Sequence, residues 1–235
     1  MSADAAQLAV VTGALGNLGP VWCDALASAG FDVVRIDIVG DDSVDVTDGD
    51  ALRAVLDNVG TPHVLVNNAG IDQAPDPNAT GGMSADEFLR VLDVNTRGVF
   101  VSTQVFGSAM AEAGRGSIVN IGSLYASIAP IPELYEHIPG FVKPPAYGAS
   151  KAGVIALTKY FARLWGPRGV RVNALSPGGV RGEQDAEFVR KYSARVPLGR
   201  MAEPSDLTRP LLFLASDASR YVTGHELLVD GGFSA

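Results

Sequence analysis

The amino-acid sequence predicts an α/β fold built on one doubly wound parallel sheet. Short apolar runs recur along the 235 residues, and the stretches between them have helical periodicity, which is the order of repeated strand and helix units. Several runs are continuously apolar rather than alternating, as expected of strands that helices cover on both faces. Right-handed crossovers between such strands make them parallel.

The expected strands are 8–12, 32–38, 63–67, 117–121, 170–174 and 226–229. Hydrophobic residues make up 47% of the chain and charged residues 19%, a mix that fills the core of a doubly covered sheet and excludes a disordered chain. The sequence has no internal repeat, and its length suits one α/β domain. We therefore expect residues 1–235 to form a single domain.

Two stretches fall outside the alternation of strands and helices. Residues 124–146 contain five prolines, too many for a continuous helix or a central strand, and residues 179–205 are rich in charge. Both are expected to be loops or short helices beyond the carboxyl ends of strands, where ligands bind in such sheets. We interpret 124–146 as an inserted loop and 179–205 as a substrate loop.

The composition excludes several functional classes. A formal net charge of −8 and the lack of a Lys or Arg run disfavour nucleic acid as a partner. Cys23 is the only cysteine, which excludes a disulfide framework and a cysteine-based zinc site, and we expect no metal. No apolar run approaches the roughly 20 residues that span a bilayer, and no export leader is recognised. We expect a cytoplasmic protein with a small-molecule substrate and no membrane or nucleic-acid partner.

The first strand leads into a glycine-rich turn at 12–19 (TGALGNLG), and a helical pattern follows over 20–29. Glycines in such a turn allow a tight bend and close approach of a pyrophosphate, which the amides opening the helix then face. Pro20 is compatible only with the first helical turn. This strand, turn and helix indicate the dinucleotide site of a Rossmann fold, with Gly13, Asn17 and Leu18 as contacts.

Asp37 ends the second predicted strand, 18 residues after Gly19, where a ribose-binding acid is expected. Its carboxylate can accept hydrogen bonds from the adenosine ribose hydroxyls, and its charge repels a 2′-phosphate. The sequence therefore predicts NAD as cofactor rather than NADP. Arg35 leaves NADP open, because an arginine can pair with that phosphate.

Tyr147 and Lys151 open a helical pattern over 147–165, and their i, i+4 spacing places both side chains on one helix face. A phenol is a weak base at neutral pH, but an adjacent ammonium stabilises the phenolate. Ser123, just past the strand 117–121, can bind a substrate oxygen. Asn95 is a polar residue within a helical pattern, which a kink or a held water would explain.

Together these residues resemble the short-chain dehydrogenase/reductase family over nearly the whole chain. Further matching stretches are 45–47 (DVT), which the resemblance places after a third strand, 67–70 (NNAG), 176–179 (SPGG), 221–224 (YVTG) and 229–232 (VDGG). The resemblance implies a catalytic tetrad of Asn95, Ser123, Tyr147 and Lys151.

The same resemblance implies the cofactor contacts. Asp45 and Val46 would contact adenine, Asn68 and Gly70 would line the cofactor cleft, and Tyr147 and Lys151 would reach the cofactor from the catalytic side. Pro177, Gly178 and Val180 would hold the nicotinamide end.

The chain departs from the family pattern in three places. Its loop glycines are spaced Gly-x-x-Gly-x-x-Gly, as in the larger epimerase-like branch, although the chain is too short for that branch's extra substrate domain. Gly182 stands where a Thr often binds the nicotinamide carboxamide. Ser123 and Tyr147 lie 24 residues apart, more than the family usually shows, so 124–146 is interpreted as an insertion beside the pocket.

The expected reaction is hydride transfer between NAD and a small alcohol or ketone, with Tyr147 exchanging a proton with the substrate oxygen. Ser123 would orient that oxygen, Lys151 would bind ribose and tune the tyrosine, and Asn95 would hold a water that links Lys151 to solvent. Two alternatives stay open: an epimerase or dehydratase that recycles NAD, suggested by the glycine spacing, and a dinucleotide-binding regulator without turnover.

The two loops offer polar residues that favour a hydroxyl-rich substrate: Tyr125, Glu133, Tyr135, Glu136, His137, Lys143, Arg181, Gln184, Asp185, Arg190, Lys191 and Tyr192. The long apolar stretches in 96–113 and 147–165 exceed what a one-sided helix needs. In the family the corresponding helices pair between subunits, so a homotetramer is expected.

Overall fold

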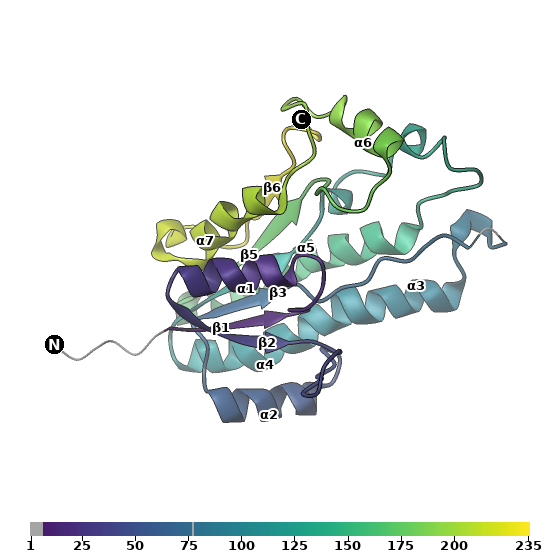
Figure 1. The fold of residues 1–235 in the computed structure, drawn as a ribbon. Helices are drawn as coiled ribbons and strands as arrows, with labels where there is room; N and C mark the ends of the chain where they lie inside the picture. The colour runs from purple at the N-terminus through teal and green to yellow at the C-terminus, as the bar shows by residue number, and fades with distance from the viewer. Residues whose placement is uncertain (1–6, 77) are drawn as a thin grey trace.

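A computed structural model describes residues 7–76 and 78–235 of the chain (Figure 1). Its centre is a six-stranded, all-parallel sheet with the strand order β2-β1-β3-β4-β5-β6. The strands are β1 (Gln7–Thr12), β2 (Phe31–Ile36), β3 (Val64–Asn67), β4 (Gly116–Ile121), β5 (Val170–Pro177) and β6 (Glu226–Val229). The predicted single-domain Rossmann-type sheet is confirmed.

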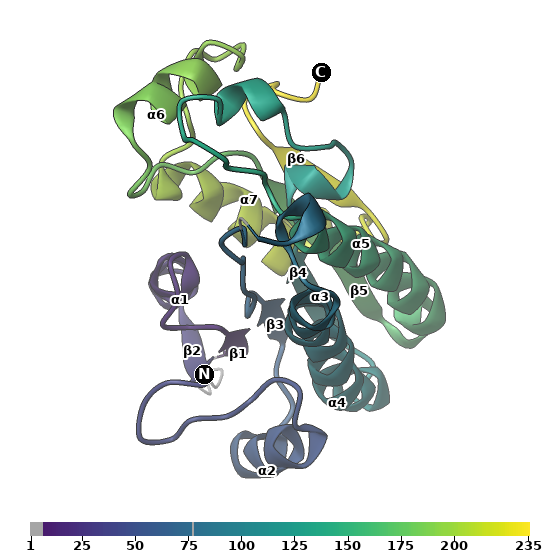
Figure 2. The ribbon, with the colours of Figure 1, turned by 90° about the vertical axis from the view of Figure 1, so that its right-hand side faces the viewer.

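Helices cover both faces of the sheet (Figure 2). They are α1 (Gly19–Ser28), α2 (Gly49–Val59), α3 (Ala85–Leu92), α4 (Gly98–Glu112), α5 (Pro145–Trp165), α6 (Ala186–Ser193) and α7 (Thr208–Ala215). Neighbouring residues on a strand point to opposite faces: Val11 packs with Trp22 of α1 and Leu211 of α7, while Val10 packs with Phe106 of α4 and Phe161 of α5. Two separate apolar cores result, one on each face.

The predicted element bounds differ from the structure in several places. The second strand ends at Ile36, so Asp37 lies just beyond it, and β5 continues to Pro177 rather than ending at 174. The further strand that the resemblance places before Asp45 is absent from the described residues: 37–48 is a loop whose turns are held by side-chain acceptors. Helix α1 begins at Gly19 with Pro20 in its first turn, as the prediction required.

The stretches 124–146 and 179–205 form loops and short helices, as predicted (Figure 1). A third apolar cluster joins them, with Leu124 and Leu134 from the first stretch and Tyr192, Val196 and Met201 from the second. We call this joined region the cap. It lies at the carboxyl ends of the strands, and it therefore forms part of any site at that edge of the sheet.

Helices α3 and α4 are continuous through a π-helical segment, Asp93–Arg97. This wider turn places Asn95 in the interior, where it is 0% exposed. Asn95 therefore lies in a helical irregularity rather than in regular α-helix, and π segments of this kind are often found at functional sites. Residues 7–76 and 78–235 form no helix with both the length and the apolar character needed to cross a membrane.

Candidate active site

The glycine loop is shaped by close backbone packing at its two ends. Gly13 has a φ of +63°, and a Cβ there would lie 2.6 Å from the Cα of Ala69. A Cβ on Gly19 would lie 2.3 Å from the carbonyl oxygen of Gly13, whereas one on Gly16 would meet nothing closer than 3.5 Å. The loop therefore requires glycine at 13 and 19 but not at 16, so the unusual spacing leaves its backbone path intact.

Hydrogen bonds tie the glycine loop to the turn after β3. The Asn68 side chain donates to the Gly13 carbonyl at 2.7 Å and accepts from the Trp22 indole at 2.8 Å. The hydroxyl of Thr12 accepts from the backbone amides of Asn68 and Ala69, both at 3.2 Å. Asn68 is thus a brace for the loop, and its amide has its partners within the protein.

Asp37 faces the glycine loop. One carboxylate oxygen accepts from the Leu15 amide at 2.8 Å and the other from the Val39 amide at 3.2 Å. Arg35 instead pairs with Asp24 on α1 at 3.8 Å. The charge beside the loop is therefore the aspartate, and the arginine that left NADP open is directed at α1.

The remaining residues expected at the adenine end have local partners. Asp45 accepts from both the amide and the hydroxyl of Thr47, each at 2.8 Å. Val46 is 7% exposed, and it packs so closely on α4 that a Cβ at Gly98 would lie 2.7 Å from its side chain. Asn17 is exposed and Leu18 is partly buried against the α1 core.

Asn95 braces the turn after β3 from the other side. Its amide accepts from the Ile71 backbone N–H at 2.7 Å and donates to the Ile71 carbonyl at 2.9 Å and to the Ser150 hydroxyl at 3.0 Å. Gly70 lies between Asn95 and Lys151, because a Cβ there would be 3.2 Å from Asn95 Oδ1 and 3.7 Å from Lys151 Nζ. Both donor hydrogens of Asn95 therefore have protein partners.

Tyr147, Lys151 and Ser123 converge at the ends of β4 and α5. Lys151 is 4% exposed, and its ammonium donates to the Ile121 carbonyl at 2.7 Å and lies 5.7 Å from the centroid of the Tyr147 ring. Ser123 caps the short helix that begins at Leu124, accepting from the Tyr125 amide at 3.2 Å. Its hydroxyl also faces the Tyr147 phenol, where hydrogen bonding lowers the phenol pKa.

Burial dominates the acid–base properties of this group. Burial, with a smaller contribution from the Asp72 carboxylate, raises the pKa of Tyr147 to about 12. Burial also lowers the pKa of Lys151 to about 8, although Asp72 opposes this change. At neutral pH the site therefore holds a neutral phenol beside an ammonium that loses its proton unusually easily.

The strand β5 delivers Pro177, Gly178 and Val180 to the same edge. A Cβ at Gly178 would lie 2.7 Å from the Cα of Asp230, and Gly179 donates to the Tyr192 hydroxyl at 2.5 Å. The Gly182 amide donates to the Gln184 side chain at 2.7 Å. A Cβ at Gly182 would have its nearest neighbours at 3.7 Å, so this position has room for a side chain.

A pocket of about 420 Å³ lies between Tyr147 and the cap. Of the loop residues proposed from the sequence, it includes Tyr125, Tyr135, Lys143, Gln184, Asp185 and Tyr192. It also includes residues that the sequence reasoning missed: Asp72, Leu124, Ile138, Phe141, Phe188 and Met201. The position of Asp72, two residues after the matched NNAG stretch, was the available signal for it.

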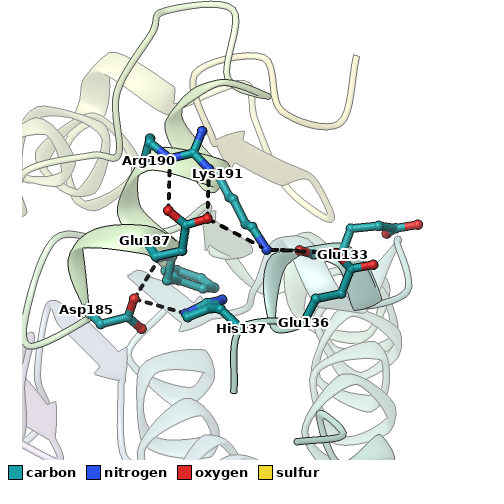
Figure 3. A network of polar contacts seen from close by, with 8 residues as sticks. Glu133, Glu136, His137, Asp185, Glu187, Arg190 and Lys191 are labelled. Atoms are coloured by element: carbon teal, nitrogen blue, oxygen red, sulfur yellow. Dashed lines mark hydrogen bonds and ion pairs between the residues drawn. The ribbon is translucent and has the colours of Figure 1, made fainter. Parts of the chain in front are cut away.

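The other loop residues hold the cap together (Figure 3). His137 contacts the Asp185 carboxylate at 3.0 Å, and Lys191 donates to the Glu133 carbonyl at 3.0 Å. Lys191 also lies 3.9 Å from both Glu136 and Glu187, and Arg190 forms a two-pronged pair with Glu187 on α6. These contacts join 132–137 to α6. The backbone N–H of Arg181 donates to the Ala202 carbonyl.

Comparisons with known proteins place this geometry in a family. Residues 19–234 match the family model described as enoyl-(acyl carrier protein) reductase. The chain is 35% identical to galactitol 2-dehydrogenase (L-tagatose-forming) of Cereibacter sphaeroides, over 96% of the chain and 94% of that protein. It is 33% identical to D-threitol dehydrogenase of Mycolicibacterium smegmatis, over 97% and 93%. The chain belongs to the short-chain dehydrogenase/reductase family.

A solved structure of this family has the same fold. The short-chain dehydrogenase of Leptospira borgpetersenii, crystallised with bound NAD⁺, superposes with a TM-score of 0.86 at 35% identity, covering 98% of this chain and 93% of that one. The family resemblance read from the sequence is therefore confirmed, and the chain is an oxidoreductase of this family.

The two ends of the glycine loop give a first prediction. Gly19→Ala is expected to lower the free energy of unfolding by about 1–3 kcal/mol, the usual cost of overpacking, and to abolish dinucleotide binding, because the new Cβ displaces the Gly13 carbonyl. Gly16→Ala is the matched control and should leave both properties close to wild type. Thermal unfolding and NADH fluorescence titration measure them, and equal effects of the two substitutions would contradict the packing argument.

Proposed function

We propose that this protein is an NAD-dependent dehydrogenase that oxidises a secondary alcohol of a small, hydroxyl-rich substrate, or reduces the matching ketone. The observation that carries the proposal is that Ser123 and Tyr147 line one pocket, with the Lys151 ammonium 5.7 Å from the centroid of the Tyr147 ring. A phenol, a buried ammonium and a hydroxyl in this arrangement can move a proton at a substrate oxygen.

The glycine loop fits a dinucleotide. Gly13 and Gly19 leave no space for side chains, so the loop keeps the tight backbone path that a pyrophosphate-binding turn before a helix requires. The contacts we propose are Gly13, Asn17 and Leu18 in the loop, Asp37, Asp45 and Val46 at the adenosine end, Asn68 and Gly70 in the cleft, Tyr147 and Lys151 at the catalytic side, and Pro177, Gly178 and Val180 at the nicotinamide end.

NAD is favoured over NADP by the two charges near the loop. The Asp37 carboxylate bonds to the Leu15 amide within the loop itself, so a 2′-phosphate there would meet a fixed negative charge. Arg35 is engaged with Asp24. The NAD⁺ named for the Leptospira relative supports the same assignment.

The chemistry requires a hydride and a proton to leave the alcohol. Bound NAD⁺ supplies the hydride acceptor, so that alcohol and NAD⁺ give ketone, NADH and one proton. Tyr147 in its phenolate form takes the hydroxyl proton and becomes a neutral phenol, Ser123 orients the substrate oxygen, and the Lys151 charge stabilises the phenolate before the transfer. In reduction Tyr147 returns the proton to the oxygen.

A polyol or sugar is the substrate class that the pocket favours. Its lining combines hydroxyls of Tyr125 and Tyr135 with the charges of Asp72 and Lys143, groups that pair with substrate hydroxyls. The galactitol and threitol dehydrogenases named above support this class.

The homotetramer stays a prediction. It is supported by an exposed apolar surface on α4 and α5, formed by Phe100, Tyr160 and Leu164.

The first test is cofactor titration followed by a substrate panel. The wild type should bind NADH more tightly than NADPH. Asp37→Ala should weaken NADH binding and reduce the difference in affinity between NADH and NADPH. Tyr147→Phe should remove nearly all turnover of polyols while NADH binding persists, because the phenol proton is lost and the ring remains. Retained turnover in Tyr147→Phe, or turnover of apolar ketones only, would contradict the proposal. NAD that stays tightly bound and is never released as NADH would contradict it as well.

The coupled titration of Lys151 and Tyr147 gives a pH prediction. Two forms of the pair carry one proton: the phenolate beside a charged lysine, which is the reactive form, and the phenol beside a neutral lysine. The ratio of these two forms does not depend on pH. The population of the reactive form therefore rises with pH until the pair has lost one proton, near pH 8, and is constant at higher pH. Oxidation (kcat/KM) should therefore rise about tenfold per pH unit below 8 and level off. Reduction, which needs both protons, should decline above 8. A pH-independent oxidation rate from 6 to 8 would contradict this.

Gly182 offers a gain of function. Gly182→Thr has space for its side chain and is expected to donate the carboxamide hydrogen bond that other family members make. One net hydrogen bond contributes about 1 kcal/mol, which corresponds to roughly fivefold tighter NADH binding. Gly182→Ala, without a hydroxyl, is the control and should show no gain. Equal affinities of the two variants would place the nicotinamide elsewhere.

A further inference from the structure

An ion pair lies on the substrate side of Tyr147. Lys143 is paired with Asp72, and both line the same pocket as the phenol. The Lys143 ammonium is 5.6 Å from the centroid of the Tyr147 ring, nearly the same distance as the Lys151 ammonium at 5.7 Å. Tyr147 therefore has two lysines near its ring, of which the resemblance to the family accounts for one.

The pair is held firmly in this place. Lys143 directly precedes Pro144 and Pro145, which fix the backbone at the start of α5, and its side chain is only 17% exposed. Asp72 follows Gly70 and Ile71, the turn that Asn95 braces, and its second oxygen accepts from the Gln73 amide at 3.0 Å. Each charge therefore lies next to backbone that prolines or hydrogen bonds constrain.

The charged and titratable groups facing Tyr147 come from every element around the pocket. Lys151 approaches the phenol ring from α5. Tyr125, Tyr135, Asp185 and Tyr192 line the pocket from the cap, where Asp185 also contacts His137. Asp72 dominates among the negative charges: it raises the pKa of Tyr147, Tyr125, Tyr135 and Lys151. An unopposed carboxylate at this point would disfavour the phenolate that oxidation needs.

We propose that Lys143 and Asp72 are positioning residues that set the acidity of Tyr147 from the substrate side, the carboxylate opposing the phenolate and the ammonium offsetting the carboxylate. The pair adds to the proposed reaction a control that acts through Tyr147, and it contributes no proton of its own. It also gives the stretch before α5 a chemical role besides pocket shape.

The proposal predicts opposite effects of the two charges. Lys143→Met leaves Asp72 unopposed, so the inflection of the oxidation profile near pH 8 should move up by about one unit. Asp72→Asn leaves Lys143 beside the phenol, so the inflection should move down by a similar amount. The double variant should return to the wild-type profile, since both charges are then absent. A role in pocket shape alone would change KM without moving the inflection.

A control tests whether any lost cation would do. Arg53→Met removes the cation of an exposed ion pair with Asp50 on α2. Because α2 packs on α4 and does not line the pocket, this substitution should leave the inflection of the pH profile unchanged. Inflections that move in the same direction in Lys143→Met and Asp72→Asn, or that do not move, overturn the proposal.

A second readout needs no turnover and so separates this inference from the proposed function. The ultraviolet absorbance of the Tyr147 phenolate is obtained by subtracting the spectrum of the matching Tyr147→Phe protein, with circular dichroism confirming that each protein is folded at the alkaline pH used. Asp72→Asn should show the most phenolate and Lys143→Met the least. If the wild type oxidises no alcohol, the proposed function fails while this order still tests the pair; equal phenolate in all variants refutes the pair even in an active enzyme.

Discussion

The buried ammonium of Lys151 is the constraint on which the rest of the site depends. A charge that is 4% exposed loses most of its hydration, and protein partners must replace it. The Ile121 carbonyl at the end of β4 supplies one acceptor at 2.7 Å. Gly70 brings the turn after β3 against the ammonium without a side chain, so backbone and cofactor-side groups can occupy the remaining space. The fold thus places Lys151 where one strand ends and another turn passes.

The position of α5, which carries both Tyr147 and Lys151, follows from buried polar contacts across the sheet. Asn67 on β3 donates to Asn120 on β4 at 2.8 Å, and Asn120 donates to Thr158 on α5 at 2.9 Å. Buried amides without such partners would cost free energy, so a shift of α5 along the sheet is disfavoured. Asn95 completes this arrangement by joining Ser150 of α5 to the turn after β3.

The parts of the site that the sequence could predict are those with local signals. The glycine turn follows an apolar strand, and Tyr147 and Lys151 share a helix face by their spacing alone. Asn95 stood out because a polar residue interrupted a helical pattern, and its π segment explains the interruption. The prediction of a further strand before Asp45 was wrong. Asp45 accepts hydrogen bonds from the amide and the hydroxyl of Thr47, and these contacts favour a turn there.

The contacts that escaped prediction join segments far apart in the chain. Asp72 and Lys143 are 71 residues apart, and His137 and Asp185 are 48 apart; no periodicity links such pairs, since loop packing alone brings them together. The predicted and the unpredicted contacts also lie in different halves of the site. The half of the site that we propose for the dinucleotide is fixed by backbone approach at Gly13 and Gly19, which leaves little freedom for substitution. The pocket half is lined largely by side chains of the cap. Changes of substrate can therefore arise in the cap while the cofactor half is retained, provided that the charges beside Tyr147 keep their balance.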